Sequence, residues 1–373
     1  MRRNVTGRIL FIGVYNLLLL YIGWHGWIWL HSAFGLHNPI SPIIITGIMG
    51  YSYFFRKKSE FLRALGSIWF GILQFSILIL PAADLILLFM KLAGKLDTAE
   101  AVIAGWIVIA VLIVIFGYGL FNAYSPVIRR YNIKVDKMCG ERKTLKLAAA
   151  SDMHFGRLSG VRHARRLAAE LAEIKPDLIL LPGDIIDDDP GPFRKKNIDK
   201  IMGEFEAPLG VYGVLGNHEY YGGGVAEYLK IMESIGIDIL LDETIEITEG
   251  LILAGRKDRT DRGRMGFAAL TRSVDSEQVL IAMDHQPYEL KEAEQAGVDV
   301  LLSGHTHRGQ MAPNHLITRR MYELDWGYLK KNNMHAFVSS GYGFWGPPLR
   351  IGSRSEILEI TIEFTGVKGG KMD

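Results

Sequence analysis

Three long apolar stretches near the start of the chain constrain its fold more than any other feature. They cover residues 9–30, 64–90 and 101–124. Each exceeds the roughly 20 apolar residues with which a helix crosses the hydrocarbon core of a bilayer, and there only a helix satisfies its own backbone polar groups. Residues 36–55 are a weaker fourth candidate, since two prolines and two glycines interrupt them. We predict about four transmembrane helices in a domain over residues 1–125.

Charged side chains divide the chain at the same place. Residues 1–125 hold 9 Lys and Arg and 4 Asp and Glu, whereas the remaining 248 residues hold 33 and 36. The second part is about 28% charged, like an ordinary soluble domain. A single uniform soluble domain is therefore excluded. The weakly acidic second part gives no support for nucleic-acid binding, and a lone cysteine, Cys139, cannot form a disulfide within the chain.

The distribution of basic residues predicts the orientation of the membrane domain. Basic residues precede residues 9–30, lie between residues 36–55 and 64–90, and follow residues 101–124. They are Arg2, Arg3, Arg8, Arg56, Lys57, Lys58, Arg63, Arg129 and Arg130. Because cytoplasmic loops are rich in Lys and Arg, we expect a multi-pass protein of the cell membrane with both ends in the cytoplasm. Three spans instead of four would move everything after Tyr124 to the other side.

Two polar residues within the apolar stretches are candidates for a function in the membrane. Asp84 has no Lys or Arg partner in these stretches, and His25 lies among tryptophans typical of a membrane interface. Ionisable residues in spans often mark transport pathways. Because each is isolated in the sequence, a helix-packing or interfacial role is the preferred interpretation.

The second part of the chain alternates short apolar runs with helix-like stretches. Residues 126–144 are polar and basic and are interpreted as a linker or the opening edge of the next domain, which covers residues 145–365 and precedes a tail over 366–373. Apolar positions recur at helical spacing in 163–174 and 224–235. Buried strands that alternate with helices predict an α/β domain in which helices cover sheets.

Five apolar runs end in residues that can bind metal ions. These residues are Asp152 and His154, Asp184, Asn217 and His218, His285, and His305 and His307. Carboxylate, amide and imidazole groups without a usable thiolate favour Mn²⁺, Fe or Zn²⁺. A two-metal site needs one bridging and several terminal ligands, and this set is large enough for both. Singly, each motif could be a turn after a strand, but five together predict one site.

The same residues resemble the pattern of the calcineurin-like metallophosphoesterase family. Its motifs DxH, GDxxD, GNHE, a lone His and GHxH stand here at 152–154, 183–187, 216–219, 285 and 304–307. The bacterial membrane-associated branch is the most similar, with its Tat-exported phosphoesterases and enzymes that cleave UDP-2,3-diacylglucosamine. The resemblance covers about residues 145–365. It implies four layers, with two packed β-sheets flanked by helices.

The resemblance also implies a role for each residue and two bound divalent metal ions. One metal would be held by Asp152, His154 and His307, the other by Asn217, His285 and His305, with Asp184 as the bridge. Asp184 and His218 are the expected catalytic residues, because His218 would contact the phosphate and assist the leaving group. Asp187 would orient a ligand, and its neighbours Asp188 and Asp189 are interpreted as surface carboxylates.

The expected function is hydrolysis of a phosphodiester or pyrophosphate bond by metal-activated hydroxide. Two divalent cations make hydroxide available near neutral pH and polarise the phosphoryl oxygens, so no Ser or Cys nucleophile is needed. The hypothesised substrates are lipid-linked or nucleotide-sugar phosphoesters, and membrane lipids are the other expected partner. The alternative is a membrane transporter or sensor whose soluble domain binds metal without turnover. The oligomeric state has no signal in the sequence.

Three further features bear on substrate choice, and each has two interpretations. The basic segment 256–264 could bind a second phosphate or lipid headgroups, or could be a solvated loop. Phe344 and Trp345 could form an apolar lip beside the site or belong to the core. Arg308 could contact phosphate, although a solvated side chain is preferred.

Overall fold

The protein is described by a computed structural model that covers residues 5–55 and 59–366. The chain divides into two compact units. The N-terminal unit comprises Met1–Gly119 and Gly346–Pro348, and the C-terminal unit comprises Leu120–Trp345 and Leu349–Asp373.

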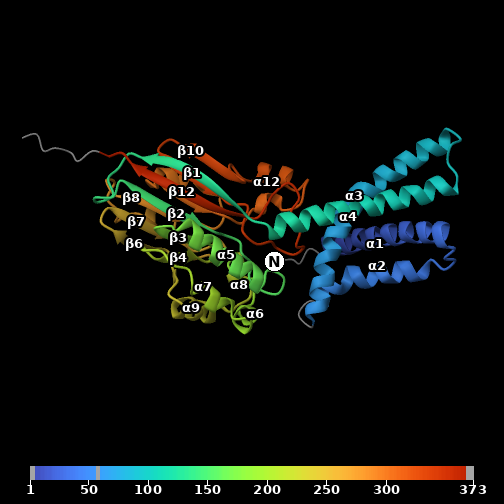
Figure 1. Cartoon of the computed structure of the whole chain (residues 1–373), viewed down its shortest axis with the longest axis horizontal. Coiled ribbons are helices and arrows are strands. Elements are labelled where there is room, and N and C mark those ends of the chain that lie inside the picture. Colours follow the sequence, from blue (N-terminus) through green and yellow to red (C-terminus); the bar gives the residue numbers. More distant parts are fainter. Residues whose placement is uncertain (1–4, 56–58, 367–373) are drawn as a thin grey trace, which may run out of the picture. The chain divides into compact units, whose positions relative to one another are not determined.

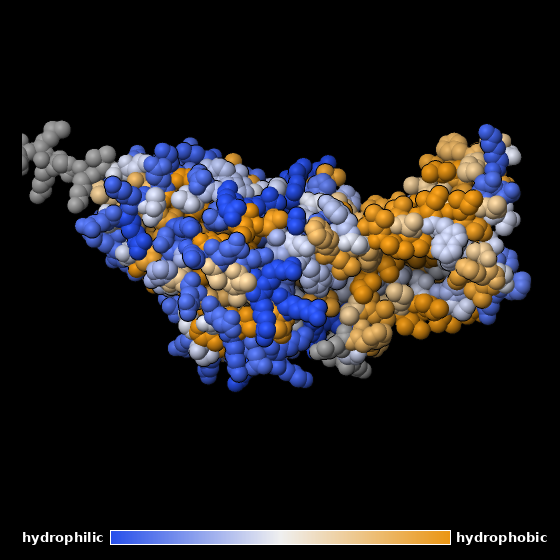
Figure 2. Space-filling model, in the orientation of Figure 1, coloured by the Kyte–Doolittle hydropathy of each residue, from blue (hydrophilic) through white to orange (hydrophobic). Residues whose placement is uncertain are grey.

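The helices of the N-terminal unit are α1 (Val5–Phe34), α2 (Ile40–Ser52), the short 3₁₀ turn η1 (Tyr53–Phe55), α3 (Glu60–Leu92) and α4 (Thr98–Tyr124) (Figure 1). Three of them, α1, α3 and α4, are long and apolar enough to cross a membrane. Figure 2 shows hydrophobic surface over these helices. Large apolar side chains that are exposed along helices of this length are typical of contact with lipid.

The fourth predicted span is shorter than expected. Residues 36–55 contain α2, which has 13 residues, and at 1.5 Å per residue it is about 20 Å long. A full crossing of the hydrocarbon core needs about 30 Å. The helix starts only after Pro39, and its end is held against α1, where the Tyr15 hydroxyl donates to the Gly50 carbonyl at 2.7 Å. The described residues therefore include three helices of spanning length and one shorter apolar helix.

Asp84 and His25 are not isolated as the sequence suggested, but their contacts agree with the preferred helix-packing role. His25 Nε2 lies 2.8 Å from Asp84 Oδ1, and the Tyr21 hydroxyl donates to Asp84 Oδ2 at 2.6 Å. The other ring nitrogen of His25 lies 2.9 Å from the Tyr21 carbonyl. Both carboxylate oxygens and both ring nitrogens thus have partners, and the cluster ties α1 to α3.

The C-terminal unit is built from two six-stranded sheets. The first has the order β1 (Val127–Val135), β12 (Glu356–Phe364), β2 (Thr144–Ala149), β3 (Leu178–Pro182), β4 (Val211–Val214) and β5 (Asp238–Ile239). The second has the order β10 (Gly327–Lys331), β11 (Met334–Val338), β9 (Val300–Ser303), β8 (Val279–Met283), β7 (Leu251–Gly255) and β6 (Glu243–Thr248). Strands β2 to β5 run parallel, as do β7, β8, β9 and β11.

Alternating side chains along the strands create the layers. Leu145 and Leu147 of β2 pack with Leu253 and Ile281 between the two sheets, whereas Ala148 faces the opposite way. Beyond the first sheet lie α5 (Val161–Ile174), α6 (Pro190–Lys195), α7 (Ile198–Met202), α8 (Asn217–Tyr221) and α9 (Val225–Ser234). Against the second sheet pack α10 (Phe267–Leu270) and α11 (Leu290–Gln295). The predicted arrangement of two packed sheets flanked by helices is confirmed, since neighbouring side chains of a strand point to opposite faces.

Within the segment 126–144, interpreted as a linker or the opening edge of the next domain, nine residues form an edge strand of the first sheet. Val127–Val135 forms β1 and pairs in parallel with β12 over its whole length. Basic side chains had hidden this strand in the sequence, yet Arg129 and Arg130 pair with Glu356 and Glu359 on β12. The last turn of α4 also belongs to the C-terminal unit, where Asn122 donates to the Arg350 carbonyl at 3.1 Å.

The tie between α1 and α3 leads to a prediction about stability. Tyr21→Phe removes the hydroxyl that donates to Asp84, and interhelical hydrogen bonds in membrane proteins contribute about 0.6 to 2 kcal/mol. We expect a lower midpoint of thermal unfolding for the purified chain in detergent. Tyr118→Phe is the matched control, because Tyr118 is an exposed residue of α4. Equal midpoints for the two variants would contradict the tie.

Candidate metal centre

The predicted ligands follow strand ends of both sheets, where the backbone is strained. Asp152, His154, Asp184, His305 and His307 all have positive φ angles between 44° and 70°. This left-handed region is unfavourable for residues with a Cβ atom. Gly183 and Gly341, also at positive φ, allow close approach, because a Cβ on either would come within 2.8 Å of a neighbouring side chain. Strain of this kind is typical of functional sites.

The first metal-binding group consists of Asp152, His154 and His307, which are all buried. The Nε2 atoms of the two imidazoles are 3.0 Å apart, and His307 Nε2 is 3.4 Å from Asp152 Oδ1. Burial lowers the pKa of both imidazoles well below the usual value, so they are neutral. Neutral imidazole is the form that binds metals.

The second group consists of Asp184, His285 and His305. His285 Nδ1 lies 2.8 Å from the Pro182 carbonyl, which makes this nitrogen the donor. The other nitrogen, Nε2, faces Asp184 Oδ2 at 3.1 Å. The two atoms are not aligned as in a hydrogen bond. Two facing acceptors in a buried site need a cation between them, either a proton or a metal ion. Burial lowers the pKa of His305 to about 4 and keeps it neutral.

Asp184 reaches both groups. Its Oδ2 atom lies 3.1 Å from His285 and 3.9 Å from His154, while Oδ1 accepts from the backbone N–H of His218 at 2.9 Å. Asn217 is buried at the start of α8. Among the residues that the structure describes, Asn217 Oδ1, His154 Nδ1 and His285 Nε2 are buried without a hydrogen-bond partner. Buried acceptors without partners are costly, and this donor set suits a divalent metal ion.

His218 lies beside the first group and has an anionic partner. Its ring is 4.6 Å from the His154 ring, and its Nδ1 is 2.7 Å from Asp188 Oδ1. Burial lowers the pKa of His218, but the hydrogen bond to Asp188 and the charge of Asp184 outweigh it and raise the pKa to about 9. The interpretation of Asp188 as a surface carboxylate was therefore wrong, whereas Asp189 caps α6 by accepting from Gly191 N.

Two buried charged residues that the sequence did not assign hold the loops of the site. Glu219 accepts from the backbone N–H groups of Gly216, Asp184 and Ile186 at 2.7, 3.1 and 3.0 Å. Arg350 is fully buried, donates to the Ser340 and Gly343 carbonyls, and lies 3.2 Å from His307 Nδ1. Glu219 belongs to the GNHE motif, but no role was predicted from the sequence for either residue.

Phe344 and Trp345, the two candidates for an apolar lip, have different positions. Phe344 is buried and packs edge-on against Tyr124, so its core interpretation holds. Trp345 is half exposed, its ring lies 6.2 Å from the His218 ring, and its backbone N–H donates to Gln310 Oε1 at 2.9 Å. Tyr221, also exposed, lies 5.5 Å from His218 on another side. An aromatic rim therefore borders His218.

The basic segment 256–264 is only partly available for binding anions. Arg256 is buried, and it shares Asp284 and Glu289 with Arg264 in four ion pairs. These two arginines are neutralised inside the domain, which neither interpretation of the segment anticipated. The guanidinium of Arg308 stacks 3.9 Å above the Trp326 ring, so the side chain is not simply solvated.

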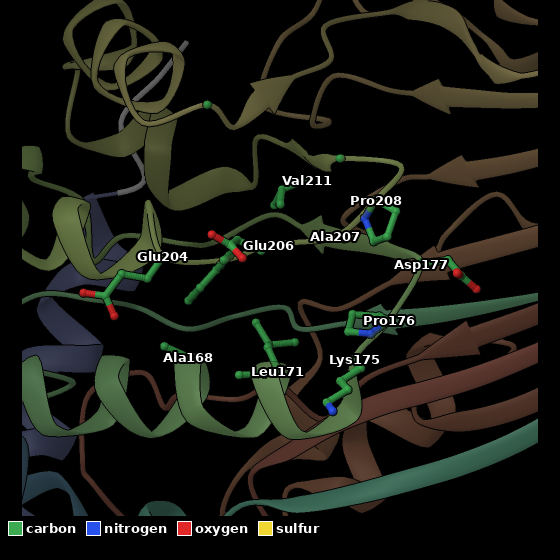
Figure 3. Close-up of a pocket in the computed structure, with 14 residues that line it drawn as sticks. Ala168, Leu171, Lys175, Pro176, Asp177, Glu204, Glu206, Ala207, Pro208 and Val211 are labelled. Carbon is green, nitrogen blue, oxygen red and sulfur yellow. The ribbon is translucent and has the colours of Figure 1, made fainter.

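A cavity of about 710 Å³ lies away from the candidate metal site (Figure 3). It is lined by Leu171 and Lys175 at the end of α5, by Asp177 just before β3, and by Glu204 and Glu206 before β4. It therefore lies at the amino ends of the strands, whereas the metal-binding groups lie at the carboxyl ends. Asp177, Glu204 and Glu206 outnumber Lys175 among the charged residues of its lining, so its charge does not favour a phosphate group.

Comparison with known proteins gives a consistent result. The family model described as calcineurin-like phosphoesterase matches residues 145–309. A metallophosphoesterase of Aquifex aeolicus is 30% identical over 267 residues, which are 69% of this chain and 99% of that protein. A transmembrane protein with metallophosphoesterase domain from Danio rerio is 30% identical over 325 residues, 79% of this chain and 74% of that protein.

One solved structure among the matches is a dimetal phosphatase from Danio rerio, with 12% identity and a TM-score of 0.33, covering 52% of this chain and 86% of that one. That likeness carries no weight beside the sequence matches. The level of identity and coverage in the Aquifex aeolicus and Danio rerio relatives is decisive. The chain belongs to the calcineurin-like metallophosphoesterase family of metal-dependent phosphoric ester hydrolases.

Proposed function

We propose that this protein is a membrane-anchored phosphoesterase that uses two divalent metal ions to hydrolyse a phosphodiester or pyrophosphate bond. The observation that carries the proposal is the pair of buried groups joined by Asp184, with acceptor atoms that lack partners. Asp152, His154 and His307 would hold one metal ion, and Asn217, His285 and His305 the other, with Asp184 as bridge. Mn²⁺, Fe and Zn²⁺ suit such ligands.

Bound metal ions would supply a hydroxide nucleophile near neutral pH and polarise the phosphoryl oxygens. The chain itself positions the proton donor. His218 is held by Asp188 at 2.7 Å, and its raised pKa of about 9 keeps the imidazole protonated near pH 7. A protonated imidazole beside the phosphate can donate to the leaving oxygen. Glu219 and Arg350 maintain the loops that carry these groups.

The proposed substrate is lipid-linked or a nucleotide sugar, and the proposed location is the cell membrane with the catalytic domain in the cytoplasm. Three helices of spanning length support the membrane location. The proposal for the side rests on the basic residues near the N-terminus and before α3. It requires α2 and η1 together to return the chain across the bilayer.

Removal of metal tests the core of the proposal. Chelation with EDTA followed by dialysis should abolish hydrolysis, and Mn²⁺ should restore it and raise the unfolding midpoint, because a ligand that binds the native state stabilises it. Asp184→Ala should lose at least about 100-fold in kcat/KM, more than residues outside the ligand set usually cost. Asp238→Ala, an exposed residue of β5, is the control. Full activity after chelation would refute the proposal.

The partner of His218 gives a second test. Asp188→Asn removes the anion that orients the imidazole and stabilises its protonated form, so kcat should fall about tenfold or more, as expected for impaired general-acid catalysis. Asp189→Asn is the matched control, because Asn caps a helix as well as Asp. Steady-state kinetics of both variants should differ clearly. Equal rates would remove His218 from the proposed mechanism.

A substrate panel in detergent tests the substrate class. Monoesters, diesters, nucleotide sugars and lipid pyrophosphates are compared, with Asp184→Ala as the background. A higher kcat/KM on lipid-linked substrates or nucleotide sugars is expected. Equal rates on small soluble diesters would contradict this substrate class and leave the helices as a tether only.

A further inference from the structure

Helix α12 (His315–Met321) differs from the other helices of the C-terminal unit because it buries no side chain. Leu316, Ile317 and Met321 are 52%, 59% and 55% exposed. These apolar side chains therefore contribute little to the core. A helix of seven residues is also too short to be stable by its own backbone hydrogen bonds. Something other than apolar packing must hold α12 in place.

Polar contacts to the metal-binding loop hold it. The Thr318 hydroxyl donates to Asp325 Oδ2 at 2.7 Å, and the Asp325 carbonyl accepts from the Thr306 hydroxyl at 2.5 Å. Thr306 stands between two predicted metal ligands in the sequence. At Gly309, with φ of 70°, a Cβ would come within 2.5 Å of the backbone that begins α12. The helix is thus fixed to the loop that carries His305 and His307.

The opposite side of α12 combines apolar and basic groups. With 3.6 residues per turn, Leu316, Ile317 and Arg320 lie on the half of the helix that faces away from Thr318 and His315, and Met321 lies at the edge of that half. Arg319 and Arg320 are exposed, and α12 contains no acidic residue. Apolar side chains among arginines are typical of helices that lie in a membrane interface, where arginine meets anionic headgroups.

Hydrogen bonds connect α12 to the end of a membrane-spanning helix. Asn122, in the last turn of α4, donates to the Arg350 carbonyl at 3.1 Å. The next residue, Ile351, accepts from Ala312 N at 2.7 Å, and α12 starts three residues later. All of these residues belong to the C-terminal unit. Only one short segment therefore separates the exposed face of α12 from the turn in which the chain leaves the apolar helix.

We infer that α12 is a membrane-contact helix that inserts Leu316, Ile317 and Met321 at the headgroup level of an anionic leaflet. The partner is the bilayer that holds the chain, because α4 brings the catalytic domain to its surface. A second copy of this chain fits poorly, since a symmetric contact would oppose arginines without a carboxylate on the helix to neutralise them. The contact would present the metal-binding loop to substrates within the membrane surface.

Site-specific fluorescence in the full chain tests this inference without any assay of hydrolysis. Cys139 is buried, so a cysteine introduced by Ile317→Cys can be labelled selectively with an environment-sensitive fluorophore. Lys230→Cys, on the exposed side of α9, is the matched control. Both proteins are reconstituted in vesicles of phosphatidylglycerol and phosphatidylcholine that contain lipids with a quencher near the headgroup.

The label at position 317 should lose fluorescence to the lipid quencher, and the label at position 230 should not. Arg319→Gln with Arg320→Gln, or vesicles of phosphatidylcholine alone, should reduce quenching at position 317. Equal weak quenching at both positions would overturn the inference, as would crosslinking of two chains through position 317. Unchanged unfolding midpoints of the labelled proteins show that the variants fold. Loss of hydrolysis in the metal tests would leave these outcomes unaffected.

Discussion

Apolar packing between the two sheets is the interaction on which the rest of the C-terminal unit depends. Strands β2 and β3 face β7 and β8 through a dry layer of Leu, Ile and Val side chains. This packing fixes the distance between strand ends that are far apart in the sequence. Asp152 and His154 follow the first sheet, whereas His305 and His307 follow the second. Without that layer the two metal-binding groups would not share Asp184.

Burial determines what the polar residues at these strand ends require. Carboxylates and imidazoles are buried together, where each acceptor needs a proton, a donor or a metal ion. Glu219 and Arg350 satisfy backbone groups of the loops, so the loops can stay buried while their side chains remain available.

Much of this could be predicted from the sequence, because motif spacing and strand periodicity are local signals. The five strand ends, the helices near 163–174 and 224–235, and the α/β class followed from such patterns, whereas the two packed sheets were implied by the family resemblance. The errors concern partners that only the three-dimensional structure brings together. Asp188 gave no sign that it lies beside His218, and Asp84 gave no sign of His25 and Tyr21. Strand β1 was hidden because its arginines pair with glutamates more than 200 residues later.

The backbone at the metal-binding groups has a consequence for the evolution and engineering of this protein. Five of the predicted ligands have positive φ angles, which glycine adopts at a lower energetic cost. Each such residue costs roughly 1 to 2 kcal/mol of folding free energy. The core must therefore be more stable than its fold alone requires. Selection for thermal stability alone would favour glycine at these positions and remove the predicted ligands. The backbone conformation of the site therefore sets stability against activity.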